Sequence, residues 1–184
     1  MQKSKGFVSA VIVVASLAAA ACASTRTTKS AGEQVDDTVT TAAVKSALIG
    51  DPTTKAYQID VETFKGTVQL NGFVDSAESK QRASEVAKKQ KGVVAVRNNL
   101  NVKSAVADNT TERVVDDSTI TSKVKTALAG DPRTKAHQVN VETHGGVVQL
   151  SGFVDTPEAK VTAETLASND DHVKSVDNEI DVQK

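Results

Sequence analysis

The sequence predicts an α+β fold made of two tandem α-β-β-α-β domains, each a three-stranded sheet with two helices on one face. Three observations predict it. The chain matches itself at an offset of 80 residues, so that Val35-Asp36-Asp37 returns as Val115-Asp116-Asp117. In each copy, apolar residues at helical spacing give way to alternating apolar residues in the same order. A glycine-containing dipeptide between two alternating runs marks a hairpin at the same place in both copies.

The first helix of each copy is expected to open at an aspartate, Asp37 or Asp117, whose carboxylate would cap the first turn. Apolar residues such as Val44 and Leu48 then lie on one face. The helix is expected to end at Gly50, and its counterpart at Gly130, because Asp-Pro follows each glycine.

Two strands and a tight hairpin are expected next. Ile59 and Val61 alternate before Lys65-Gly66, and Val68 and Leu70 alternate after it. In both copies a glycine interrupts the second strand just before a phenylalanine, which predicts a β-bulge and a core position for the aromatic ring. These pairs are Gly72 with Phe73 and Gly152 with Phe153.

The second helix is expected to begin at Asp75-Ser76 and to run to about Gln90, and its counterpart has Thr156 as cap and Pro157 at the first helical position. A final strand follows, in which apolar residues alternate about Asn98 in the first copy and about Asn178 in the second. These residues are Val94, Val96, Leu100 and Val102, and Val176, Ile180 and Val182. Each copy has only about 70 residues, a size at which one core gives limited stability, so the two copies are expected to dock against each other.

The amino terminus is typical of a signal peptide over residues 1–21. Lys3 and Lys5 precede an apolar run that is too short to span a bilayer and ends in small residues. The small residues lead into the single cysteine, Cys22, which resembles the lipobox of bacterial lipoproteins, although Ala19 stands where leucine is usual. This resemblance implies that Cys22 is acylated and that Ala23 directs the protein to the outer membrane, facing the periplasm. Ordinary cleavage, which could remove Cys22, is the alternative.

The expected domain organisation follows from the repeat. Residues 22–34 are polar and read as a flexible tether, and residues 104–114 as a linker. The first domain is expected over residues 35–103 and the second over 115–184.

Composition and charge limit the function. The net charge of −1 gives no reason to expect a nucleic-acid partner. The copies have diverged, however, because residues 35–103 carry ten basic and eight acidic side chains, whereas residues 115–184 carry seven and twelve. The second helix of the first copy is basic and is a candidate site for phospholipid headgroups or another acidic partner. Its candidate residues are Lys80, Arg82, Lys88, Lys89 and Lys91. A solvated helix face is the alternative interpretation.

The sequence offers no catalytic or cofactor motif. His137, His144 and His172 lack metal-ligand spacing, and no Gly-x-Ser-x-Gly or phosphate-binding glycine motif occurs. The pairs Asp36-Asp37 and Asp116-Asp117 are interpreted as caps and not as acid–base pairs. The chain is therefore expected to have no enzymatic activity, no bound metal and no cofactor.

Both copies also carry a Val-x-Leu-x-Gly-x-Val-Asp strand ending and an asparagine-centred final strand, and together they resemble the BON domain. This resemblance covers nearly all of residues 35–184. It implies a non-enzymatic protein of the periplasm or outer membrane that binds phospholipid membrane or an envelope protein and supports outer-membrane integrity under osmotic or envelope stress. The alternative is a soluble periplasmic protein with a protective or chaperone-like role.

Overall fold

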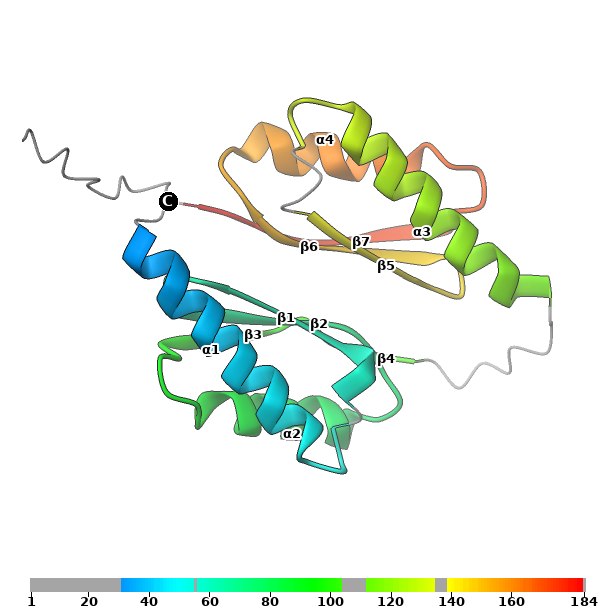
Figure 1. The fold of residues 1–184 in the computed structure, drawn as a ribbon. Helices are drawn as coiled ribbons and strands as arrows, with labels where there is room; N and C mark the ends of the chain where they lie inside the picture. The colour runs from blue at the N-terminus through cyan, green and yellow to red at the C-terminus, as the bar shows by residue number, and fades with distance from the viewer. Residues whose placement is uncertain (1–30, 55, 104–111, 135–138, 184) are drawn as a thin grey trace, which may run out of the picture.

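The computed structural model describes residues 31–54, 56–103, 112–134 and 139–183, which form two domains with their sheets between outer pairs of helices (Figure 1). The first domain contains α1 (Ala31–Ile49), a short 3₁₀ turn (Ala56–Gln58), β1 (Ile59–Phe64), β2 (Thr67–Val74), α2 (Ala77–Lys88), β3 (Ala95–Asn98) and β4 (Asn101–Val102). The second contains α3 (Glu112–Gly130), β5 (Val139–His144), β6 (Val147–Val154), α4 (Pro157–Ser168) and β7 (Ser175–Val182).

The predicted α+β class and the order of elements are confirmed. In each sheet the second strand is central, with an antiparallel hairpin partner on one side and the parallel final strand on the other. In the first copy the final strand is divided into β3 and β4, both of which pair with β2, so this sheet has four strands. In the second copy β7 is continuous and the sheet has three.

The hairpin turns form where the glycine-containing dipeptides predicted them. Lys65 and Gly66 have φ angles of 48° and 74°, and Gly145 and Gly146 have 61° and 80°. Positive φ at both central residues defines the type I′ turn, whose twist suits a two-residue hairpin.

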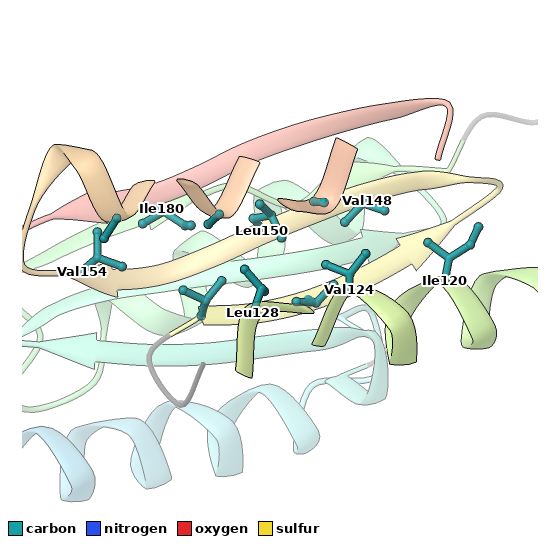
Figure 2. Packing of buried hydrophobic residues seen from close by; sticks show 12 residues of the cluster. Ile120, Val124, Leu128, Val148, Leu150, Val154 and Ile180 are labelled. Carbon is teal, nitrogen blue, oxygen red and sulfur yellow. The ribbon is translucent and has the colours of Figure 1, made fainter. Parts of the chain in front are cut away.

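Each domain has its own apolar core between its helices and its sheet. Figure 2 shows this core in the second copy, where Ile120, Val124 and Leu128 of α3 point toward Val148 and Leu150 of β6. The first copy repeats it with Val44 and Leu48 of α1 against Val68 and Leu70 of β2. The helix–sheet interface therefore uses the apolar stripes expected from the sequence.

The first helices start earlier than expected, and their aspartates do not cap them. α1 begins at Ala31, inside the expected tether, and α3 begins at Glu112, inside the expected linker. Asp37 is a buried residue within α1, and its carboxylate accepts the backbone N–H groups of Lys65 and Gly66 at 2.8 and 2.9 Å. Asp117 binds the other hairpin turn in the same way. The cap prediction was wrong because both helices begin several residues earlier, so the aspartates lie inside them and their carboxylates bind the hairpin turns.

The bulge predicted at Gly72 is wrong, since the pairing of β1 with β2 runs without an extra residue up to Gly72. Gly72 instead has a φ of 115°, and a Cβ there would lie 2.8 Å from Glu142 Oε2 of the other domain. Glycine is needed because of this φ and because a Cβ would collide with the backbone oxygen of Gln58 in the same domain. Gly152 also has a regular register and a φ of 117°.

Phe73 and Phe153 were expected in the core, and this is also wrong. Both are only partly buried, and neither belongs to an apolar core cluster. Side chains alternate along a strand, so Leu70 and Val74 face the helices while Phe73 faces the other domain. The Phe73 ring centroid lies 5.4 Å from that of His144, and the Phe153 centroid lies 5.2 Å from that of Phe64.

The two sheets contact each other through their polar faces, and the contacts are reciprocal. Gln149 Oε1 accepts the backbone N–H of Gly72 at 2.6 Å, and Gln69 Oε1 accepts that of Gly152 at 3.1 Å. Both glutamine side chains are fully buried. The expected docking of the copies is therefore present, through an interface in which hydrogen bonds replace an apolar core.

Several predictions concern residues outside the described part of the chain: the signal peptide, Cys22, residues 23–30 of the expected tether, residues 104–111 of the expected linker, and His137. Among the residues that the structure does describe, no helix combines the length and apolar character needed to cross a membrane.

Candidate functional site

The five basic residues predicted as a site fall into two groups. Arg82 lies partway along α2, where its Nε donates to Asp51 at 2.7 Å and its Nη1 to Glu85 at 3.2 Å. The Arg82 bond holds the pKa of Asp51 below its usual value. Lys80 is partly buried one turn from the start of α2. These two side chains lie away from the end of the helix, and Arg82 already has acidic partners.

Lys88, Lys89 and Lys91 form the second group, at the carboxyl end of α2. Lys88 is the last helical residue, Lys89 is the C-cap, and Lys91 lies in the turn that follows. All three side chains are exposed, and none has an ion pair with any residue of the described ranges. We call residues 88–94 the first tip.

The first tip is held in place by backbone contacts. The N–H of Val94 donates to Gly66 O of the β1–β2 turn at 2.8 Å, and that of Val93 donates to Gln90 O at 3.3 Å. On its other side, Gly92 packs against Thr40 of α1. The lysines therefore project from a fixed turn.

An exposed apolar residue completes the first tip. Val94 is 81% exposed, more than any other exposed large hydrophobic residue among those described. The sequence pattern placed it in the final strand and missed this exposure. Comparison of the copies could have found it, because the position equivalent to Val94 is Lys174, and a position that faces solvent tolerates such a change.

The equivalent turn of the second copy, residues 168–174, is the second tip, and Asp170 and Lys174 in it have polar partners. Asp170 accepts the backbone N–H of His172 at 2.9 Å and lies 3.2 Å from Lys123 Nζ. The His172 N–H is the main cause that lowers the pKa of Asp170 to about 2. Lys174 Nζ donates to Gly145 O at 2.6 Å. Charged side chains of the second tip thus have partners, whereas the three lysines of the first tip have no ion pair with a described residue.

The two tips lie at opposite ends of the molecule. In Figure 1 the turn after α2 is at the left, beside the first half of α1, and the turn after α4 is at the right. The protein is therefore basic at one end and carries Asp170 and Asp171 at the other.

The described residues show no arrangement typical of catalysis. The ring of His144 lies tilted against that of Phe73, and His172 Nδ1 lies 3.0 Å from Asp170. A shallow hollow of about 580 Å³ lies along α3, but its Ser122 and Thr126 hydroxyls donate to helix carbonyls one turn earlier. A metal-binding group of three or more His, Cys, Asp or Glu side chains is absent from the ranges described.

Comparison with known proteins gives consistent matches. The BON domain family matches residues 36–104 and 116–184. The chain is 38% identical to Osmotically-inducible protein Y of Escherichia coli, over 81% of this chain and 74% of the relative. It is 33% identical to outer membrane lipoprotein DolP of Haemophilus influenzae, over 94% of this chain and 86% of the relative. A 21 kDa hemolysin of Actinobacillus pleuropneumoniae is 30% identical to it, over 74% of this chain and 69% of the relative.

Proposed function

Because this chain belongs to the BON-domain family through both of its copies, we propose that it is a non-enzymatic bacterial envelope protein that binds anionic phospholipid. One relative is by name osmotically inducible and another is an outer-membrane lipoprotein. In this proposal the protein supports outer-membrane integrity and tolerance of osmotic and envelope stress. An acidic envelope protein is the other partner that the same site could take.

The observation that carries the proposal is the contrast between the tips. The two tips occupy equivalent positions in the repeat, and Asp170 and Lys174 of the second tip have partners. The first tip exposes three lysines without an acidic partner in the described chain. Unpaired cations on a fixed turn suit an anionic surface, since binding gains attraction without breaking ion pairs.

The attachment to the membrane is part of the same proposal. We expect residues 1–21 to be removed and Cys22 to be acylated, which would hold the protein at the periplasmic face of the outer membrane. Two or more acyl signals give stable anchoring, whereas a single chain binds only reversibly. The lysines would then add to the anchor instead of replacing it.

Vesicle binding tests the lipid partner. Changing Lys88, Lys89 and Lys91 to Gln removes three charges worth about 1 kcal/mol each near an anionic surface, so partitioning should fall by up to about 100-fold. We expect this loss on vesicles that contain phosphatidylglycerol and little change on phosphatidylcholine alone.

A charge-matched control distinguishes the effect of the first tip from the effect of net charge. Lys123→Gln, Lys125→Gln and Lys174→Gln together remove the same charge from the second copy. Equal loss with both triple variants, or no loss with the first, would show that the first tip is not the lipid site.

The second candidate is a soluble periplasmic protein that protects other proteins under stress, which the similarity to an osmotically inducible relative favours. The mass of the mature protein separates the two candidates. An acylated Cys22 supports the anchored form, whereas cleavage without acylation supports the soluble form.

A further inference from the structure

The first tip and the beginning of α1 lie at the same end of the first domain. Asp37, in the first half of α1, binds the backbone of Lys65 and Gly66 in the hairpin turn. The carbonyl of Gly66 in turn accepts the N–H of Val94 at 2.8 Å. Helix, hairpin turn and first tip are thus joined by consecutive hydrogen bonds. Figure 1 shows the same arrangement, with the first half of α1 beside the turn that follows α2.

The chain that follows Cys22 therefore enters the first domain at the end that carries the first tip. A helix rises about 1.5 Å per residue, so Ala31 lies only about 9 Å along α1 from Asp37. The intervening residues 23–30 can span at most about 28 Å when extended. An anchor at Cys22 and the first tip can consequently reach the same membrane leaflet.

The charges also orient the molecule. The first tip contains Lys88, Lys89 and Lys91 and no acidic residue, so it carries an excess of positive charge. The second tip, at the far end, carries Asp170 and the exposed Asp171. A negative surface attracts the first end, whereas Lys123 and Lys174 offset Asp170 and Asp171 at the second end, and this difference favours a single orientation.

Val94 gives this end an apolar contact as well. Its side chain is 81% exposed, while its backbone is fixed to the hairpin turn. Lysine side chains beside it can keep their ammonium groups at the headgroups while their methylene chains lie on apolar surface. Surfaces that combine exposed apolar side chains with lysines bind at the boundary between lipid headgroups and acyl chains.

We propose that the protein meets an anionic phospholipid bilayer end-on, through the first tip. Lys88, Lys89 and Lys91 lie among the headgroups, Val94 reaches the boundary of the acyl chains, and the second tip points away from the membrane. The anchor and the tip then bind as two linked contacts, and the short tether keeps the local concentration of membrane high at the tip. This inference rests on the proposed function and adds the orientation of the bound protein.

Two matched cysteine variants test the orientation. Ala95→Cys follows Val94 in the first copy, and Ser175→Cys is the equivalent exposed position in the second. Each is made in the chain from Ala23 onward, which lacks the natural cysteine but contains every described residue. An environment-sensitive fluorophore on each cysteine reports contact with vesicles that contain phosphatidylglycerol and nitroxide-labelled lipid.

We expect the Ala95→Cys label to be quenched by the nitroxide and blue-shifted, and the Ser175→Cys label to stay as in buffer. Changing Val94 to Ser should reduce the blue shift at position 95 while co-sedimentation with vesicles is largely kept. Equal quenching at both positions, or quenching at position 175 alone, would overturn the end-on orientation and leave lipid binding intact. If neither labelled chain co-sediments with the vesicles, the proposed function itself fails.

Discussion

Asp37 joins two elements that are distant in sequence. Its carboxylate lies within α1 but binds two consecutive amides of the β1–β2 turn, and Asp117 does the same in the second copy. Hydrogen bonds to a charged acceptor are stronger than those between neutral groups. A single residue type therefore fixes the angle at which the first helix crosses the hairpin in both domains.

Removing this carboxylate should destabilise the first domain. Asp37→Ala leaves the turn amides of Lys65 and Gly66 without their acceptor, and we expect the free energy of unfolding to fall by about 1 to 3 kcal/mol. Urea denaturation measures the loss. Asp36→Ala changes the same residue type on the same helix at an exposed position, so it should shift stability by no more than about 0.5 kcal/mol. Equal effects of the two variants would show that the turn contact contributes nothing.

At the scale of elements, the packed sheet faces are polar and carry several carboxylates. Glu142 of β5 lies close to Gly72 of the other domain, and burial, followed by the charge of Asp60, raises its pKa above the usual 4.5. Burial also raises the pKa of Glu179 on β7, with a further contribution from Asp177. The docked sheets thus hold carboxylates that ionise less readily than they would in water.

Docking should consequently depend on pH. A raised carboxyl pKa means that the folded form binds protons more tightly than the unfolded form, so stability is gained as the pH falls through the raised value toward 4.5 and is lost as it rises. Glu142→Gln, which cannot ionise, should be more stable than the parent at about pH 7, and this advantage should shrink toward about pH 5. Thermal unfolding at several pH values measures it. A constant difference across this range would contradict the assigned cause.

The elements themselves were largely predictable from the sequence, because helix faces, caps and hairpin turns depend on local patterns. Ser76 and Thr156 cap α2 and α4 as expected, each accepting from the amide three residues later. The positions predicted wrongly depend on distant partners. Asp37 binds a turn and Phe73 faces the other domain, and neither partner can be found from periodicity within one copy.

The candidate site was predictable only in part, for the same reason. The five basic residues are near one another in sequence, but Arg82 is paired with Asp51, which lies 31 residues away. The exposure of Val94 depends on how the turn packs against Gly66, which periodicity within one copy does not reveal. The difference between the first tip and the rest of α2 therefore arises from tertiary contacts.

For the whole molecule, two copies of one fold are joined through reciprocal contacts and point their tips in opposite directions. The two copies share one architecture but differ in charge. In the proposed function, the first copy binds the membrane while the second completes the docked interface. We therefore propose that the two repeats divide these two tasks between them.

Exchange of the tips tests this division most directly. Replacing Lys88, Lys89 and Lys91 by their second-copy equivalents gives Lys88→Ser, Lys89→Asn and Lys91→Asp, and the reciprocal change is Ser168→Lys, Asn169→Lys and Asp171→Lys. Co-sedimentation with vesicles that contain phosphatidylglycerol is measured in the chain from Ala23 onward, which lacks the anchor, for the first exchange alone and for both together. We expect the first exchange to abolish binding and the second, added to it, to restore part of it. Binding that survives the first exchange unchanged would contradict the assignment of membrane contact to the first tip.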